Sequence, residues 1–279
     1  MLSGGRSLQV WGDPIAHSLS PRLHDTAYRV LGLDWSYGRR RVDEDSFAAE
    51  VAGLGPDARG LSLTMPLKRV AHAASVTRNR HAELSGAVNT LLFTAGGPHG
   101  FNTDVAGIAA DVRFHGVRDV GRARIVGSGA TATSALLALD ALGVRDVEVA
   151  ARRPERAAPL AALGERIGMR VHVAALDARV RDDVPLTIAT LPGGAVLDAA
   201  VCDGLAERGG TLYDVVYGHW PTDLARAWER HGSRAVLGVG MLVEQALRQV
   251  RVFVAGTDEE PLPDEPAVLN AMRAAVTED

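Results

Sequence analysis

The chain has 279 residues, of which 47% are hydrophobic and 23% charged, and its net charge is −4. This length supports one large or two modest globular domains that need no metal or disulfide to complete a core, and the mild negative charge gives no general attraction to nucleic acid or membrane. The single cysteine, Cys202, is typical of a buried apolar residue and fits a reducing compartment. With no signal-like start and no apolar run of about 18 residues, the sequence predicts a soluble cytoplasmic protein.

The first hundred residues alternate short apolar runs with stretches of helical spacing. Short apolar runs predict strands over 8–12 and 88–93, and period-two spacing predicts a strand over 60–64. An amphipathic pattern predicts a helix over 21–31. Ser20 before Pro21 is predicted to be the N-cap of that helix. Gly96-Gly97-Pro98 is predicted to be a turn.

Residues 122–237 show a different sequence pattern, in which predicted strands with continuous apolar residues alternate with predicted helices. This alternation predicts a parallel sheet with helices on both faces. Two further helices, over 241–254 and 265–276, are predicted to pack back on the first domain. The predicted strands cover 124–127, 147–150, 170–173, 186–190, 212–215 and 235–237, and the predicted helices 131–142, 155–167 and 223–231.

The run I-V-G-S-G-A-T-A over 125–132 joins a predicted strand to a predicted helix through a Gly-x-Gly-x-x-Ala turn. Such a turn lets the pyrophosphate of a dinucleotide approach the backbone at the start of a helix. Glycines also serve ordinary tight turns, but the flanking strand and helix favour dinucleotide binding. The residues predicted to hold the phosphates are Gly127, Ser128, Gly129, Ala130 and Thr131.

The second strand of this domain indicates which dinucleotide is bound. An NAD site usually has an acid at the end of that strand, whereas this chain continues into Arg152 and Arg153. Glu148 lies mid-strand, where its side chain should point away from the loop. Paired guanidinium groups suit a 2′-phosphate and favour NADP, the alternative being a solvated turn.

Four short motifs in the first domain carry polar side chains at strand or domain edges, where ligands commonly bind. They are His17-Ser-Leu-Ser-Pro21, Thr64-Met-Pro-Leu-Lys68, Gly86-Ala-Val-Asn-Thr90 and Asn102-Thr-Asp104. Two serines next to a helix start can bind a carboxylate. A lone lysine and aspartate are usually a surface ion pair of little consequence, and it is their position at these edges that favours a site.

Together with Asp214-Val-Val-Tyr217 and the segment 238–245 (G-V-G-M-L-V-E-Q), these motifs resemble shikimate dehydrogenase over nearly the whole chain. The resemblance implies two α/β domains with a cleft between them: a substrate domain over 1–105 with 241–279, and a Rossmann-type NADP domain over 106–240. It implies that Lys68 and Asp104 form a catalytic pair. It further implies that the substrate is bound by Ser18, Ser20, Thr64, Asn89, Tyr217 and Gln245, and that Gly238 and Met241 contact the cofactor.

The implied reaction is the reversible reduction of 3-dehydroshikimate by NADPH, in aromatic amino acid biosynthesis, by a monomer or homodimer that uses no metal. The sequence departs from the family pattern at Ser62 and Asp25, where asparagine is common, and at 151–153, which reads A-R-R rather than N-R-T. The loop after Tyr217, with His219 and Trp220, departs from it as well. An NAD-preferring quinate/shikimate dehydrogenase is one alternative. A non-catalytic dinucleotide-binding sensor is another, which needs no proton-transfer pair.

Overall fold

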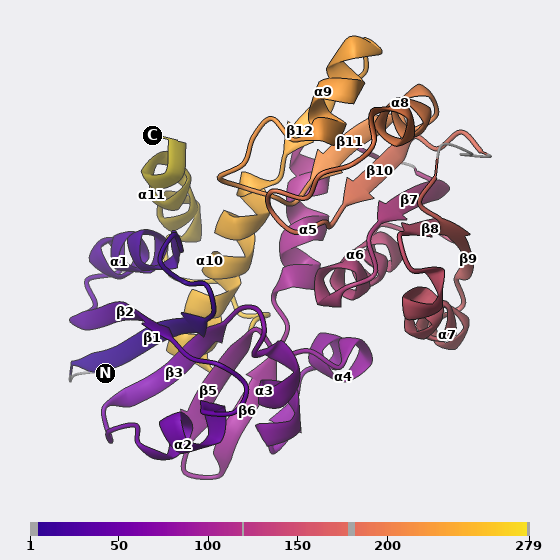
Figure 1. Cartoon of the computed structure of the whole chain (residues 1–279). Helices are drawn as coiled ribbons and strands as arrows, with labels where there is room; N and C mark the ends of the chain where they lie inside the picture. Colours follow the sequence, from indigo (N-terminus) through magenta and orange to yellow (C-terminus); the bar gives the residue numbers. More distant parts are fainter. Residues whose placement is uncertain (1–4, 119, 178–181, 278–279) are drawn as a thin grey trace. The chain divides into compact units, whose positions relative to one another are not determined.

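The computed structural model describes residues 5–118, 120–177 and 182–277 (Figure 1). The chain divides into two compact units, one made of Met1–Gly107 and Val243–Asp279 and the other of Ile108–Leu242. The outermost residues of the predicted domains, 1–4 and 278–279, lie outside the described part. Both units are α/β structures, as the sequence predicts.

The first unit is built on a mixed sheet with the strand order β2-β1-β3-β5-β6-β4. β1 pairs in parallel with β2 and β3, whereas β3, β5 and β6 form an antiparallel meander. Because β1 and β3 are parallel and β5 is antiparallel to β3, the ends of β1 and β3 and the start of β5 lie at the same end of the sheet. The strands are β1 (Arg6–Gly12), β2 (Trp35–Arg41), β3 (Ala58–Leu63), β4 (Thr77–Arg78), β5 (Thr90–Thr94) and β6 (Gly97–Phe101).

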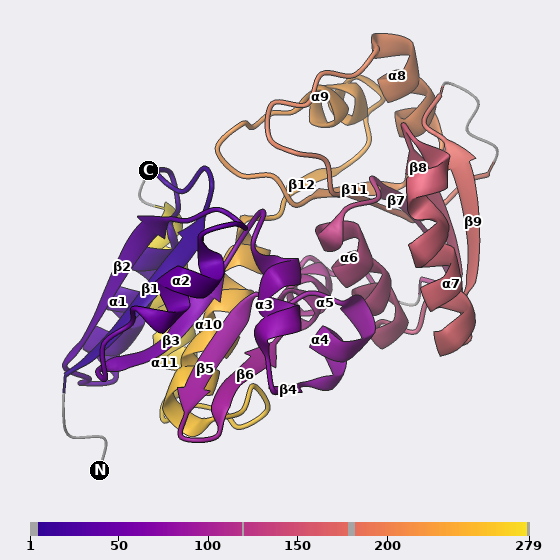
Figure 2. The same ribbon diagram turned by 60° about the horizontal axis from the view of Figure 1, so that its bottom comes forward.

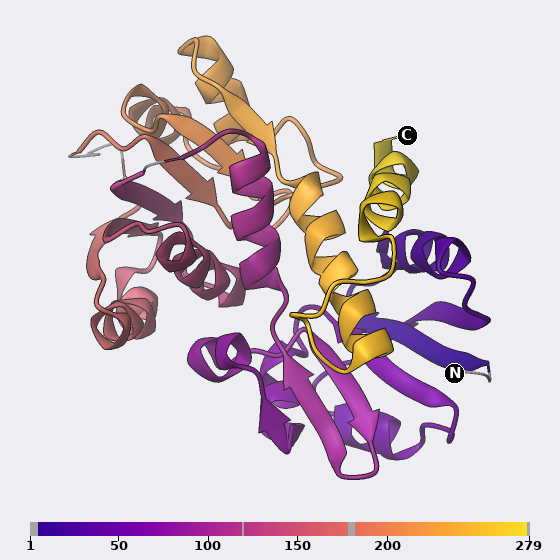
Figure 3. The same cartoon turned by 180° about the vertical axis from the view of Figure 1, so that it is seen from behind.

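Helices cover both faces of this sheet. α1 (Ser20–Val30), α10 (Val239–Ala255) and α11 (Glu265–Thr277) lie on one face (Figures 1 and 3). α10 approaches β3 so closely that a Cβ on Gly60 would lie 2.6 Å from Phe253 Cε1. The other face carries α2 (Phe47–Ala52) and α3 (Lys68–Ala74), and α4 (Arg80–Ser85) follows β4.

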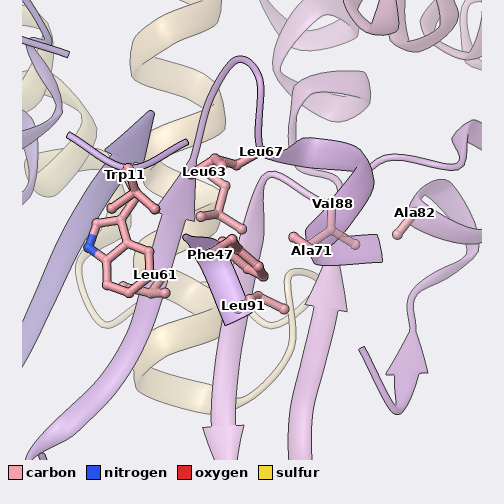
Figure 4. Packing of buried hydrophobic residues seen from close by; sticks show 10 residues of the cluster. Trp11, Phe47, Leu61, Leu63, Leu67, Ala71, Ala82, Val88 and Leu91 are labelled. Atoms are coloured by element: carbon pink, nitrogen blue, oxygen red, sulfur yellow. The ribbon is translucent and has the colours of Figure 1, made fainter. Parts of the chain in front are cut away.

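The core under α2 and α3 is apolar and closely packed (Figure 4). Trp11 from β1 meets the ring of Phe47 edge to face, with 6.2 Å between the centroids. Leu67 is fully buried at the residue before Lys68. Since buried apolar area is the main stabilising contribution to a fold, this core holds the start of α3 firmly in place.

The second unit has an all-parallel sheet with the order β12-β11-β10-β7-β8-β9. Read from β9, this is the 3-2-1-4-5-6 order of a Rossmann fold, with the change of direction between β7 and β10. The strands are β7 (Arg122–Val126), β8 (Asp146–Ala151), β9 (Arg170–Ala175), β10 (Leu186–Ala189), β11 (Thr211–Asp214) and β12 (Ala235–Leu237).

Helices lie on both faces of this second sheet, as its continuous apolar strands predict. α6 (Ala130–Ala141) and α7 (Ala158–Ile167) cover one face, and α8 (Ala199–Glu207) and α9 (Asp223–Arg230) the other (Figure 2). A one-turn 3-10 helix, η1 (Pro154–Ala157), precedes α7, so the single helix predicted over 155–167 is in fact two segments. α5 (Asp104–Phe114) leads from the first unit into the second.

Two local predictions are wrong. Ser20 is not an N-cap but the first residue of α1, because Leu19 already has helical torsions and occupies the N-cap position. The predicted turn at Gly96-Gly97-Pro98 lies one residue earlier, at Ala95 and Gly96, and Gly97 and Pro98 belong to β6. Pro98 has no N–H to donate, but the neighbouring segment uses only its carbonyl, which accepts from Val76 N at 2.9 Å. A proline can therefore stand in this strand.

Several short elements of the fold have no clear pattern in the sequence. β2 lacks an apolar run because it is an edge strand that needs only Trp35 and Tyr37 in the core and exposes its arginines. The helices α2 to α5 and α8 were not predicted either. Four of these five have six to nine residues, too few for a clear periodic signal.

His24 of α1 makes the stability of the first unit dependent on pH. Its ring is fully buried, stacks on Tyr37 with 4.0 Å between centroids, and burial lowers its pKa to about 3. Between about pH 6.5 and 3, His24 is therefore protonated in the unfolded chain but not in the folded chain. The free energy of unfolding consequently decreases as the pH falls from about 6.5 toward 3.

We therefore expect the wild type to lose about 2 kcal/mol more stability between about pH 7.5 and pH 5 than His24→Gln, which has no ring to protonate. Urea unfolding of both proteins at the two pH values measures this difference. Equal losses in the two proteins would contradict the assignment of the pH dependence to His24.

Candidate active site

Lys68 and Asp104 form a short ion pair in the first unit, with Lys68 Nζ 2.5 Å from Asp104 Oδ2. Each is the first residue of a helix, α3 and α5 respectively. Only 16% of the lysine side chain and 6% of the aspartate side chain are exposed. The pair is therefore held in a partly desolvated setting, where charges interact more strongly than at an open surface.

Asp104 has its carboxylate fixed from two sides. Oδ2 meets Lys68, and Oδ1 accepts a hydrogen bond of 2.7 Å from Asn89 Nδ2. Its backbone N–H donates to Asn102 Oδ1 at 3.1 Å, which satisfies one amide at the start of α5. The start of a helix also favours a negative charge, so this position stabilises the ionised carboxylate.

Lys68 is the only lysine among the 30 basic residues of the chain. The other 29 of these lysine and arginine positions are occupied by arginine, which carries a similar charge but does not release its proton at physiological pH. A lysine retained only at this buried pair therefore fits a role in which the group gives up and regains a proton.

Asn89 lies between β3 and β6 and is 1% exposed. Its Oδ1 accepts from Thr103 N at 2.9 Å and from Thr90 Oγ1 at 2.8 Å. These two donors orient the amide so that Nδ2 faces Asp104. Gln245 Oε1, on α10, lies 3.5 Å from the same Nδ2, at the limit of hydrogen bonding.

The serine segment runs from the end of β1 to α1 and lies beside the turn that carries Thr64. A Cβ on Gly12 would be only 2.3 Å from Thr64 Cγ2, so glycine is required where the two strand ends meet. Ser18 is half-buried and Ser20 buried, and Ser20 N donates to Ser18 Oγ at 3.3 Å. Arg39 holds this segment from β2 by donating to the carbonyl of Ala16.

The structure thus gathers six predicted residues within the first unit: Ser18, Ser20, Thr64, Lys68, Asn89 and Asp104, with Gln245 reaching Asn89 from α10. Tyr217 belongs to the second unit, where 38% of it is exposed. Its segment is anchored by Asp214, whose Oδ2 accepts from Thr222 Oγ1 at 2.8 Å, and burial raises the pKa of that carboxyl. Gly238 and Met241 also lie in the second unit, both buried.

The glycine loop lies at the switch point of the parallel sheet, between β7 and β10. Gly127 has φ +124°, and a Cβ there would lie 2.4 Å from Thr190 Oγ1, so both torsion and space require glycine. Gly129 has neither constraint: its φ is −89°, and an added Cβ would meet nothing within 4 Å. Gly129 is also the N-cap of α6 and offers no side-chain cap. An open glycine before exposed helix amides fits a bound pyrophosphate.

Arg152 and Arg153 directly follow β8, and both are exposed. Within the described ranges neither guanidinium has an ion-pair partner. Glu148 is not available to a ribose, because its Oε1 accepts from Arg124 Nε at 2.6 Å and the arginine side chain is completely buried. The residues present therefore fit a 2′-phosphate better than an unsubstituted ribose.

Four residues that hold the site were given no role from the sequence. Three of them stand inside the predicted motifs and the fourth, Gln249, stands in none: Thr90, Asn102, Thr103 and Gln249. Asn102 and Thr103 stand beside Asp104 in a segment that was singled out, so their proximity was a usable signal. Gln249 had none except its place one helical turn after Gln245.

Among the residues that the structure describes, no cluster of histidine, cysteine and acidic side chains could hold a metal ion. Within the same residues, none of the helices is long and apolar enough to cross a membrane.

Comparison with known proteins decides the family. A family profile described as the shikimate dehydrogenase substrate binding domain matches residues 10–91. The shikimate dehydrogenase (NADP(+)) of Acidiphilium cryptum is 37% identical over 271 residues, which cover 95% of each chain. The chain belongs to the shikimate dehydrogenase family.

Solved shikimate dehydrogenases share its fold. The enzyme of Mycobacterium tuberculosis is 36% identical, with a TM-score of 0.83 over 96% of this chain and 99% of that one. The enzyme of Thermus thermophilus, solved in complex with NADP(H) and shikimate, is 29% identical with a TM-score of 0.80, over 97% of this chain and 99% of that one. The two-domain α/β fold expected for a shikimate dehydrogenase is thereby confirmed.

Proposed function

We propose that this chain is an NADP-dependent shikimate dehydrogenase, an oxidoreductase that interconverts shikimate and 3-dehydroshikimate. The observation that carries the proposal is the buried pair of Lys68 and Asp104, with the only lysine of the chain placed against a carboxylate that Asn89 orients. Its close relatives, named shikimate dehydrogenase (NADP(+)), support the same reaction.

Residues 1–105 with 241–279 are the substrate domain in this proposal, and residues 106–240 are the NADP domain. Bound NADP supplies the hydride acceptor for shikimate oxidation. It is held by the loop Gly127 to Thr131 and the start of α6, by Arg152 and Arg153 at the 2′-phosphate, and by Gly238 and Met241. The open Gly129 and the exposed arginines support this placement.

Lys68 performs the proton transfer. In the oxidation direction, its neutral amine accepts the proton of the reacting hydroxyl at Nζ, and in the reduction direction its ammonium returns that proton to the developing alkoxide. The ammonium also stabilises the alkoxide as charge develops. Asp104 fixes the position of Nζ through the ion pair.

The other side chains bind and orient the ring. Ser18 and Ser20, at the start of α1, take the carboxylate with the help of Tyr217. Thr64, Asn89 and Gln245 take ring hydroxyls. Asn89 then serves twice, since the same amide that would meet a hydroxyl also holds Asp104.

The enzyme acts on a small molecule, in the cytoplasm, as a monomer or homodimer in aromatic amino acid biosynthesis, and binds neither nucleic acid nor membrane. The single cysteine of the chain, Cys202, is a free buried thiol, which fits a reducing compartment.

Absorbance at the NADPH band tests the function, with shikimate or quinate and NADP or NAD in the four combinations, in alkaline buffer. We expect rapid reduction of NADP with shikimate and much slower reaction in the other three. Activity mainly with NAD and quinate would favour a quinate/shikimate dehydrogenase. If protein that still binds NADP shows no reaction in any of the four combinations, a non-catalytic dinucleotide-binding protein would be favoured.

A further inference from the structure

A buried hydrogen-bond chain extends behind the Lys68–Asp104 pair into the core of the first unit. It starts at Gln249 of α10, which is 2% exposed and lies one turn after Gln245. Gln249 Nε2 donates to the carbonyl of Asn89 at 3.2 Å and to Thr90 Oγ1 at 3.1 Å. Its Oε1 accepts from Ser62 Oγ at 2.8 Å.

The direction of each bond in this chain is determined by chemistry. A backbone carbonyl can only accept, so the amide nitrogen of Gln249 must face Asn89 and its oxygen must face Ser62 and His24. His24 Nε2, 3.1 Å from that oxygen, must then carry the ring proton, and His24 Nδ1 accepts from Tyr28 OH at 3.1 Å. Every hydrogen-bonding atom of the Gln249 amide is thereby used.

These bond directions also determine how the Asn89 amide faces the Lys68–Asp104 pair. Because Thr90 Oγ1 accepts from Gln249, its own proton points to Asn89 Oδ1, 2.8 Å away. Asn89 therefore turns its Nδ2 to Asp104 Oδ1, at 2.7 Å. A reversed Asn89 amide would set its carbonyl oxygen against the carboxylate of Asp104 and weaken the hold on Lys68. Thr103 N supports the same orientation from the other side.

We propose that Gln249 is a positioning residue of the reaction: through Thr90 it holds the Asn89 amide in the one orientation that aligns Asp104 with Lys68. Gln249 touches neither of the paired groups and acts only through Thr90 and Asn89. This inference rests on the proposed function and names a residue that the sequence motifs did not include.

The test compares Gln249→Met, Thr90→Val and the double variant with the wild type in shikimate oxidation. Each single change removes the hydrogen bond between Gln249 and Thr90, through which the orientation reaches Asn89. We expect kcat to fall about tenfold in each, the size of effect that one hydrogen bond has. The double variant should be no slower than the slower single variant, because both break the same chain. Gln249→Glu is the second substitution if Gln249→Met does not fold, since it keeps the shape of the side chain but, when ionised, cannot donate to Asn89.

Ser75→Ala is the matched control for lost stability. Ser75 is also buried in the first unit and donates to the carbonyl of Ala71 at 2.7 Å, but it has no hydrogen bond to the chain described above. We expect its kcat to equal that of the wild type. Near-normal kcat in folded Gln249 variants, or losses that multiply in the double variant, would overturn the proposal.

A second measurement follows the environment of the Lys68 amine through a carbon-13 label and does not require enzyme turnover. Reductive methylation with carbon-13 formaldehyde labels only Lys68 and the amino terminus, because the chain has no other lysine. The Lys68 signal should move in Gln249→Met and stay in place in Ser75→Ala, and an unmoved signal would refute the positioning role. If the wild type does not oxidise shikimate, the proposed function fails, while this signal still decides whether Gln249 controls the pair.

Discussion

Lys68→Met is expected to lower kcat for shikimate oxidation by about 10²- to 10⁴-fold, the usual contribution of a positioned proton-transfer group. KM for shikimate should change little, because ring and carboxylate contacts are assigned to other side chains. Methionine keeps the length of the side chain, so that loss of the amine is separated from loss of packing. Steady-state kinetics with saturating NADP measure both constants.

Lys68→Arg separates charge from proton transfer. Arginine keeps the positive charge beside Asp104 but cannot give up its proton, so we expect a loss of kcat nearly as large as in Lys68→Met. Arg69→Lys, at the exposed next position, introduces a lysine without altering the pair and should behave as the wild type. Substantial turnover in Lys68→Arg would show that the site needs only a fixed positive charge, and the proton transfer would have to be reassigned.

The second large effect concerns the cofactor. Replacing both Arg152 and Arg153 by alanine should raise KM for NADP by about 10²-fold and leave KM for NAD nearly unchanged, because each lost bond is to a charged phosphate that NAD lacks. Arg156→Ala is the matched control, since Arg156 is equally exposed in the same turn. Kinetics with the two cofactors measure the change in preference. If the two KM values rise together, the arginines support the loop in general and do not recognise the 2′-phosphate.

Both predictions rest on residues that the sequence motifs identify by themselves. Lys68, Asp104 and Asn89 stand in short motifs, and the structure places them in direct contact. The glycine loop was recognised because a tight turn between strand and helix requires particular residues at particular spacings. The parallel sheet of the second unit followed from apolar strands alternating with helices, a pattern that leaves few other arrangements.

Local patterns failed at the start of α1 and at an edge strand, and they did not reveal a pairing between two strands. Ser20 was expected to cap α1, but Leu19 already has helical torsions, so Ser20 is the first residue of the helix. β2 was missed because an edge strand may expose most of its side chains. Glu148 was predicted to point away from the cofactor loop, but its partner, the buried Arg124, is visible only when β7 and β8 are paired.

The sequence by itself therefore determined the chemistry proposed for this protein. It shows which side chains can transfer a proton, which loop can hold the pyrophosphate, and which arginines can bind a 2′-phosphate. These depend on residue type and short spacing, which a linear chain displays directly. Only the tertiary structure decided how the pair is held, because Gln249 reaches Asn89 across 160 residues of sequence. Hydrogen bonds between such distant positions are formed by the packing of α10 on β3, and no local pattern encodes that contact.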